Sequence, residues 1–151
     1  MADQKLQFCT FYLDSLFFGV DVLQVQEIIR HQEMTRVPLA PNEVEGLINL
    51  RGDIVTAIDL RRRLRLPDRA SDAEPTNVVV RDKESAVALL VDEIGDVLEV
   101  DEETFEPTPE TLDTTVRELI TGVYKLDGRL LHVLDTDRAV ALDRAAVVSQ
   151  V

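Results

Sequence analysis

The sequence predicts a mainly β protein built from two similar halves, on the basis of three observations. Short apolar segments recur about every ten residues, and turn residues separate them. Hydrophobic residues make up 45% of the 151 residues and charged residues 30%, which is typical of a soluble globular domain. The stretch at 46–59 resembles the stretch at 122–135. Together they favour an all-β sandwich or barrel with an internal duplication.

The first elements expected are a hairpin and a short helix. Residues 6–13 and 16–20 are aromatic and apolar on either side of Asp14–Ser15, which predicts two paired strands. Asp21 is placed to cap a helix, because Gln24 follows three residues later, as in a capping box. Apolar residues at spacings of three and four predict one face of this helix; they are Val22, Val25, Ile28 and Ile29.

A second hairpin and a linker complete the first half. Residues 47–51 and 54–60 are apolar around Gly52–Asp53, which predicts a tight turn between two strands. Residues 67–75 are polar and rich in Ala, Asp and Ser, so they are the best linker candidate. We therefore treat the chain as one domain of two intertwined β subdomains, with the boundary near 67–76.

The second half repeats this plan. Residues 77–80 and 86–91 predict another strand pair. Residues 101–115 are acidic and contain two prolines, which predicts a loop with at most a turn or two of helix. The clearest hairpin turn joins the next two segments. The expected elements there are strands at 123–126 and 130–134 around Asp127–Gly128, then a closing helix from Thr136 to about Val147 capped by Asp135.

The internal repeat has an offset of 122 − 46 = 76 residues, half of the chain. Glycines, a central leucine, a closing aspartate and a following arginine fall in step in the two copies. Any two hairpins share glycine and apolar alternation, but this ordered set favours a true duplication. The seam between two packed subdomains would be a natural groove for a partner.

The overall charge of −13 argues against two classes of partner. Nucleic-acid backbones need a basic footprint, and anionic lipid surfaces attract basic segments. No apolar run approaches transmembrane length, and the first residues lack the pattern of a signal peptide. A single cysteine fits a reducing compartment. We expect a cytoplasmic protein without membrane insertion.

A search for catalytic and cofactor motifs finds little. The glycine-rich, nucleophile-elbow and zinc-protease motifs are missing from the sequence. His31 is expected at the surface, and Cys9 to be a packed, inert thiol. His132 could act as a pH switch, but a strand histidine facing away from Leu131 and Val133 is favoured.

Asp59 and Asp135 each end an apolar strand, and capping a following turn explains both. No catalytic residue, cofactor or metal site is predicted.

Charge is unevenly distributed along the chain. A basic run occupies 61–65, whereas no Lys or Arg lies between Lys83 and Arg117, a span that carries ten acidic residues in the stretch from Asp92 to Asp113. The two runs are either solvated faces or complementary patches that orient partners.

Five motifs stand in order along the chain: Val25–Ile28, Arg36–Pro38, Gly46–Gly52, Ile58–Arg61 and Leu89–Asp92. The most specific part is Asn-Leu-Arg-Gly followed by Ile-Asp-Leu-Arg. Together the motifs resemble the CheW family of bacterial chemotaxis coupling proteins, and the resemblance runs from about Gln7 to Leu142. Ala57 and Ala88 depart from the residues common in the family, but both are small.

This resemblance implies two five-stranded, SH3-like β-barrel subdomains around a shared apolar core, with short helices and a C-terminal helix. It implies a non-enzymatic adaptor that joins the cytoplasmic tips of chemoreceptors to the histidine kinase CheA. The kinase's regulatory domain resembles the adaptor and would be its direct partner. Such a protein would be cytoplasmic and associated with receptor arrays at the inner face of the membrane.

The resemblance also implies partner-binding residues. Arg51 and Glu27 fall on motif positions linked to the kinase-facing surface. An arginine at a hairpin end can present its planar fork to a carboxylate, and Glu27, expected on the short helix, is the candidate partner within the chain. Their motif neighbours complete the expected surface: Val25, Ile28, Asn49 and Gly52.

Two other functions stay open at this point. An acidic β-barrel could bind a cationic protein partner outside chemosensing, in which case binding would depend steeply on salt. A hydrolase that uses acidic residues would need a carboxylate with a strongly raised pKa in a cleft.

Overall fold

The computed structural model describes residues 5–70, 72–81 and 85–142. Its strands are β1 (Lys5–Leu13), β2 (Leu16–Asp21), β3 (Val25–Ile29), β4 (Val44–Leu50), β5 (Asp53–Asp59), β6 (Thr76–Arg81), β7 (Ala86–Val91), β8 (Glu93–Asp101), β9 (Phe105–Glu106), β10 (Ile120–Leu126) and β11 (Arg129–Leu134). Its short helices are η1 (Val22–Gln24), α1 (Leu60–Arg63), η2 (Glu102–Thr104), α2 (Thr114–Glu118) and α3 (Thr136–Ala139). The prediction of a mainly β protein is confirmed.

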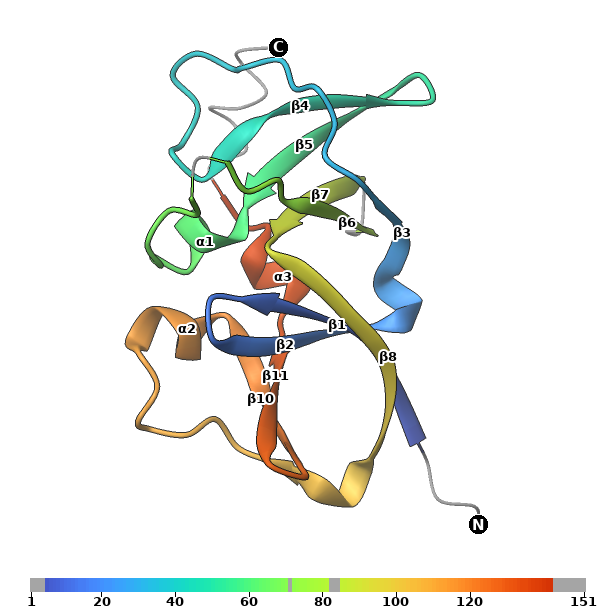
Figure 1. Cartoon of the computed structure of the whole chain (residues 1–151), viewed down its shortest axis with the longest axis vertical. Helices are drawn as coiled ribbons and strands as arrows, with labels where there is room; N and C mark the ends of the chain where they lie inside the picture. Colours follow the sequence, from blue (N-terminus) through green and yellow to red (C-terminus); the bar gives the residue numbers. More distant parts are fainter. Residues whose placement is uncertain (1–4, 71, 82–84, 143–151) are drawn as a thin grey trace.

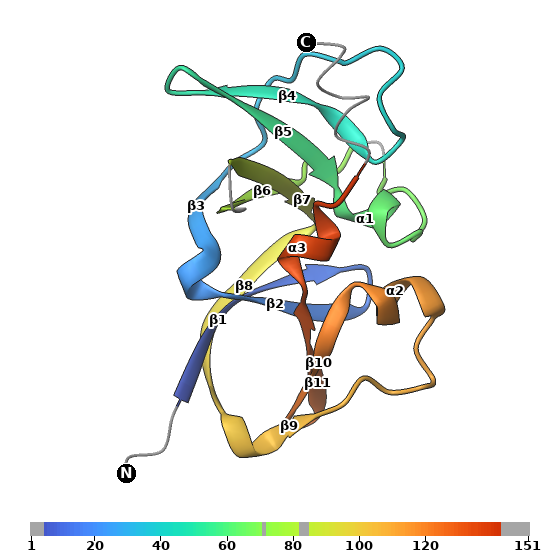
Figure 2. The same cartoon turned by 180° about the vertical axis from the view of Figure 1, so that it is seen from behind.

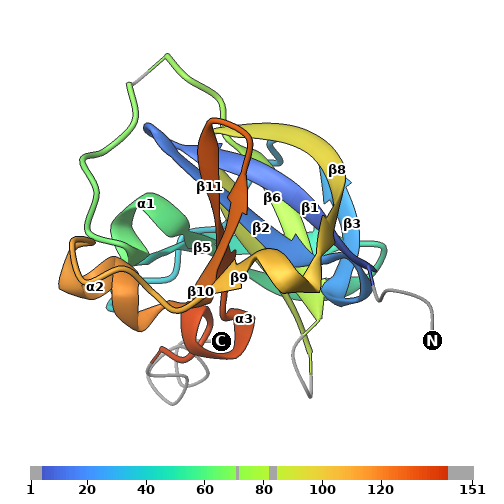
Figure 3. The same ribbon diagram turned by 90° about the horizontal axis from the view of Figure 1, so that it is seen from below.

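The described strands form two sheets, one above the other in Figure 1. Sheet A has six strands in the order β8-β1-β2-β11-β10-β9, and sheet B has five in the order β3-β6-β7-β5-β4. Sheet A exceeds the expected five strands because the two-residue strand β9 pairs with β10 at its edge. Seen from below in Figure 3, β8 and β11 lie on either side of β1 and β2.

The two sheets exchange hairpins. The first hairpin, β1–β2, pairs with β8 and β11 from the second half of the chain, and β6–β7 pairs with β3 and β5 from the first half. The chain therefore changes sheet between β2 and β3 and again between β7 and β8. Residues 67–75 connect α1 to β6 and so separate the sequence repeats; as a domain boundary, the 67–76 region stays a prediction.

The main apolar core lies between the sheets and receives side chains from both. Phe11 and Phe18 stack with ring centroids 5.7 Å apart and are almost fully buried. Burying a side chain of this size stabilises a fold by about 1.5–3 kcal/mol. Large contributors from sheet A are Phe11, Leu13, Phe18 and Val20, and those from sheet B are Ile58, Val78, Val80 and Leu89. Each sheet also has its own smaller cluster.

The helix predicted after Asp21 is wrong beyond its first turn. Asp21 does cap it, because its Oδ1 accepts a hydrogen bond of 2.9 Å from the Leu23 N–H. The helix ends at Gln24, and Val25–Ile29 form strand β3 against β6. The β-branched residues there fit a strand edge, and exposure alternates along β3 as a strand requires. The helical spacing of these apolar residues was therefore misleading.

Strand β8 is missing from the prediction. Four of its nine residues are acidic, and a register shift of β8 against Cys9–Phe11 interrupts the alternation of apolar and polar residues. The 101–115 region holds two short helices, as expected, together with β9. Of the closing helix, α3 is observed over Thr136–Ala139, and residues 143–147 lie outside the described residues.

Candidate functional site

The β4–β5 hairpin turns one residue earlier than the sequence predicts. Leu50 pairs with Asp53, which leaves Arg51 and Gly52 as the two central residues, with φ of 52° and 92°. Positive φ at both positions is the signature of a type I′ turn, whose twist matches that of the flanking strands. The Asn49 Oδ1 accepts a hydrogen bond of 2.9 Å from the Gly52 N–H. Asn49 and Gly52 therefore fix the turn that presents Arg51.

Arg51 and Glu27 form a two-pronged ion pair. The Arg51 Nη1 lies 2.7 Å from Glu27 Oε2, and Nη2 lies 2.8 Å from Oε1. The arginine side chain is 76% exposed, but the glutamate is only 18% exposed. The hydrogen bonds from Arg51, and a weaker one from Gln26, lower the pKa of Glu27. The pair sets the direction of an exposed guanidinium whose remaining N–H groups face solvent.

Strand β3 positions Glu27 for this contact. Its register against β6 shifts between Val25 and Glu27. Val25 packs against the core between the sheets, so it supports the surface but does not form it. Ile28 is 41% exposed, but it follows Glu27 directly in an extended strand and so points to the opposite face of β3; its part in partner binding stays a prediction.

Sequence reasoning missed Ile54, which follows the β4–β5 turn and is 58% exposed. Its only signal was a large apolar residue beside a turn. A hollow opens next to the Arg51–Glu27 pair, between the β4–β5 hairpin and strands β6 and β7. Among its lining residues are Gln26, Arg51, Ile54, Arg81 and Ala86. We refer to Arg51, Glu27 and Ile54 as the fork surface.

A second exposed apolar area lies where the sheets meet. Leu23 in η1 is 88% exposed, and Val97 in β8 is 57% exposed. Val97 in β8 pairs with Cys9 in β1, and Cys9 pairs with Val20 in β2. Strand β2 ends one residue later, at Asp21, and the chain then enters η1. Figures 1 and 2 both place η1 beside the crossing of β1 and β8. We refer to Leu23 and Val97 as the seam surface.

A polar network joins the sheets at the other passage of the chain. Arg61 from α1 places Nη2 2.6 Å and Nε 2.8 Å from the two carboxylate oxygens of Asp92, between β7 and β8. Arg69 bonds to Asp59 at 3.1 Å and lies 3.4 Å from Asp92. These four side chains are between 5% and 21% exposed. Sequence reasoning found motifs that contain Asp59, Arg61 and Asp92, but it placed Arg69 in the linker and missed the network.

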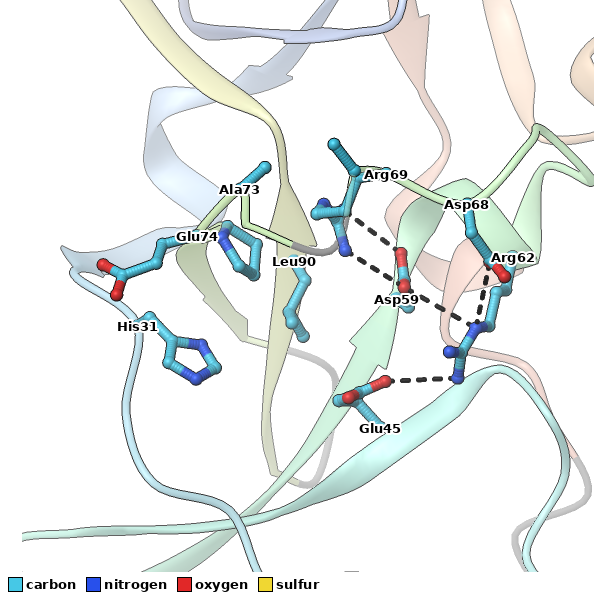
Figure 4. Close-up of a pocket in the computed structure, with 11 residues that line it drawn as sticks. His31, Glu45, Asp59, Arg62, Asp68, Arg69, Ala73, Glu74 and Leu90 are labelled. Atoms are coloured by element: carbon cyan, nitrogen blue, oxygen red, sulfur yellow. Dashed lines mark hydrogen bonds and ion pairs between the residues drawn. The ribbon is translucent and has the colours of Figure 1, made fainter.

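A polar hollow opens beside this network (Figure 4). Asp59 lies between Arg69 and Arg62, and Arg62 in turn bonds to Glu45 at 3.2 Å. Its arginines are thus already paired with carboxylates of the same chain. Among the described residues, no cluster of three or more His, Cys, Asp or Glu side chains could hold a metal ion.

The remaining sequence candidates fall in structural positions. His31 is exposed, and Cys9 is buried, which raises the pKa of its thiol. His132 does face away from Leu131 and Val133, but it is buried, with Nδ1 2.8 Å from the Phe17 carbonyl oxygen.

Asp59 and Asp135 cap α1 and α3 as expected. The acidic run lies on β8, η2, β9 and the loop before α2, all in the part of the chain that contributes to sheet A. No described helix has the length and apolar composition that a membrane crossing would need.

Comparisons with known proteins agree on one family. The CheW-like domain matches residues 7–144. The chemotaxis protein CheW of Klebsiella aerogenes is 32% identical over 145 residues, covering 96% of this chain and 87% of that protein. The chemotaxis protein CheW of Bacillus subtilis is 33% identical over 141 residues, covering 93% and 89%.

The fold agrees as well. The crystal structure of the scaffolding protein TtCheW from Thermoanaerobacter tengcongensis matches with a TM-score of 0.83 at 27% identity, over 93% of this chain and 95% of that one. The chain belongs to the CheW-like family of chemotaxis proteins.

Proposed function

We propose that this chain is a non-enzymatic adaptor that couples the cytoplasmic tips of chemoreceptors to the histidine kinase CheA. It would act in the cytoplasm, at receptor arrays under the inner face of the membrane. The observation that carries the proposal is the fork surface, where a fixed turn holds an exposed arginine beside Glu27 and the exposed Ile54. Such a surface binds by shape and charge and needs no chemistry of its own.

The fork surface suits the regulatory domain of the kinase. Arg51 uses one edge of its guanidinium on Glu27, and the remaining N–H groups are free to bind a partner's carboxylate or carbonyl oxygens. Ile54, which lines the same hollow as Arg51, adds apolar area beside it. A planar, oriented donor with apolar neighbours is typical of the small set of residues that dominate protein interfaces.

The seam surface suits a receptor tip, which is a helical hairpin. Leu23 lies in η1, on the passage between the sheets, and Val97 lies in β8 of sheet A; both offer apolar contact to one face of a helix. Each contact needs to bury only about 800 Å² per partner. Array geometry supplies the remaining affinity, because a partner held by one site is at high effective concentration for the next.

The test is co-sedimentation of variants with receptor-bearing membranes and kinase, together with a thermal melt. Arg51→Glu should weaken kinase recruitment and leave receptor binding unchanged, because it reverses the charge at the fork surface alone. Arg117→Glu is the matched control, since Arg117 is also exposed but lies on α2. Unchanged kinase recruitment by a folded Arg51→Glu protein would remove the fork surface from the interface.

The receptor arm of the same experiment uses Val97→Asp. This variant should lose receptor binding and keep kinase binding, because it places a charge in the apolar seam. Leu39→Asp is its control: Leu39 is 88% exposed but lies in the loop between β3 and β4. Equal loss of receptor binding in both variants would contradict a specific seam surface.

A further inference from the structure

The chain passes between the sheets twice, and the two passages differ in how they are held. At the passage from β7 to β8, Asp92 accepts hydrogen bonds from Arg61 and, at 2.8 Å, from the backbone N–H of Asp14. At the passage from β2 to β3, Asp21 accepts from Leu23, two residues ahead in its own turn. Hydrogen bonds therefore connect the first passage to both sheets, whereas the hydrogen bond that Asp21 accepts stays within its own turn.

Three separate parts of the molecule meet at Asp92. Arg61 belongs to α1, which directly follows strand β5 of sheet B. The Asp14 N–H belongs to the β1–β2 turn of sheet A, where Asp14 has a φ of 56°. Arg61 also donates to the Pro67 carbonyl at 2.8 Å, so its guanidinium is held on two sides. Asp92 is thus the point at which a turn of sheet A and a helix of sheet B are bonded to one carboxylate.

The environment of this contact makes it stronger than an ordinary surface pair. The side chains of Arg61 and Asp92 are 13% and 21% exposed, so water screens them little. Burial alone would raise the pKa of Asp92, but the hydrogen bonds from Arg61 and Asp14 and the charges of Arg61 and Arg69 outweigh it, and the pKa is lowered. The charged form of Asp92 is therefore the one that the fold stabilises.

The internal repeat shows why the other passage has no such contact. An offset of 76 places Asp137 at the position equivalent to Arg61, and Val20–Asp21 corresponds to Val91–Asp92 with an offset of 71. An Arg–Asp pair at one passage thus becomes two carboxylates at the other. Like charges cannot form the equivalent bond, so the duplicated fold carries the contact on one side.

We propose that Arg61, Asp92 and the Asp14 N–H form a clasp that fixes the orientation of sheet A relative to sheet B. Because Val97 lies in sheet A and Arg51 lies in the β4–β5 turn of sheet B, the clasp also sets how the seam surface and the fork surface are placed relative to each other. This second consequence rests on the proposed adaptor function. The clasp residues are positioning residues: they touch neither partner.

An uncoupled adaptor is the expected result of breaking the clasp. Each surface lies away from Asp92 and keeps its own supporting contacts, so each partner should still bind. The fixed geometry between them is lost, and receptor state should no longer control kinase activity through the adaptor. A residue that only stabilised the fold would instead weaken both bindings together.

The first experiment needs no partner. Spin labels on cysteines introduced at Asp53 and Asp127, in the exposed turns of sheets B and A, report the distance between the sheets by pulsed electron resonance. Asp92→Asn and Arg61→Gln should each broaden a narrow distance distribution, and the double variant should broaden it no further, because both changes remove one interaction. Asp21→Asn, at the other passage, should leave the distribution narrow.

The second experiment measures receptor control of kinase activity in reconstituted arrays. Asp92→Asn should reduce that control by about fivefold or more, while the affinity for each partner measured alone stays unchanged. Narrow distributions in folded Asp92→Asn and Arg61→Gln proteins would overturn the clasp. Failure of the unaltered protein to bind receptor or kinase would overturn the adaptor function but leave the distance result standing.

Discussion

Apart from the added β9, sheets A and B share strand order and pairing, but they use opposite charges at equivalent turns. In sheet B, Arg51 at the β4–β5 turn pairs with Glu27, and Asp53 follows it. In sheet A, Asp127 takes the place of Arg51 and Arg129 the place of Asp53. Arg129 lies 3.9 Å from the centre of the Phe17 ring and donates to the Tyr12 hydroxyl at 2.8 Å.

The difference separates what builds this fold from what gives each end its chemistry. Turn glycines, strand alternation and the aspartate caps are the same in both repeats, because the backbone geometry requires them. Turn charges carry no such requirement. One turn therefore presents an arginine outward beside a carboxylate, while the other covers an aromatic ring with its arginine.

The largest expected effect tests whether the two sheets are one cooperative unit. Phe18→Ala should lower the free energy of unfolding by about 3–5 kcal/mol, because it empties a fully buried site in the core that both sheets share. Leu89→Ala, on the sheet B side of that core, should cost about 2–5 kcal/mol.

Both tyrosines, Tyr12 and Tyr124, lie in sheet A, and the chain has no tryptophan. Tyrosine fluorescence therefore reports sheet A alone, whereas far-ultraviolet circular dichroism reports both sheets. The two signals should follow the same urea transition in both variants. Separate transitions would show that the sheets unfold independently, which would contradict the view that sheets A and B are one cooperative unit.

An intermediate effect distinguishes the clasped passage by its pH dependence. The pKa of Asp92 is lower in the folded protein than in the unfolded chain, so its stabilising effect is present above an unfolded pKa of about 3.9 and is lost as pH falls through the folded value. Asp92→Asn should cost about 1–3 kcal/mol at neutral pH. Denaturation at a series of pH values should show this cost shrinking below about pH 4.

Arg61→Gln provides the matching measurement, because it removes the main hydrogen-bond donor to Asp92 and leaves the carboxyl in place. Its cost should also shrink in acid. A constant difference from the unaltered protein across the whole pH range would mean that Asp92 does not stabilise the fold through its charge.

The smallest expected effect sharpens the contrast between the two turns. Arg129→Ala should lower the free energy of unfolding by about 0.5–1 kcal/mol, because it removes a cation–π contact at an exposed site. Arg129→Lys, which keeps the charge but loses the planar stacking, should recover only part of it. A full recovery in thermal melts would assign the effect to charge alone.

Local signals predicted much of this structure. The hairpins at β1–β2, β4–β5 and β10–β11 were predicted because their turn residues and alternation lie within a few positions of one another. The caps at Asp59 and Asp135 were predicted for the same reason. The Arg51–Glu27 pair was expected from family motifs, not from spacing, since the two residues lie in different strands.

Two errors have physical causes. Strand β3 has apolar residues at helical spacing, and only the open edge of β6 made it a strand. Strand β8 is acidic and interrupted by a register shift, so its sequence pattern predicts a loop. Pairing with β1 makes it a strand. In both cases the neighbouring strand, contributed by the other half of the chain, decided the local structure.

The sequence by itself determined that this protein is mainly β, duplicated and a member of the CheW-like family, because these properties follow from short patterns and their order. Only the tertiary structure decided that the two halves exchange hairpins and that one passage between them is clasped. Asp92 meets Arg61 across 31 residues and Asp14 across 78. Contacts over such separations leave no local pattern, because their geometry exists only after both sheets have formed.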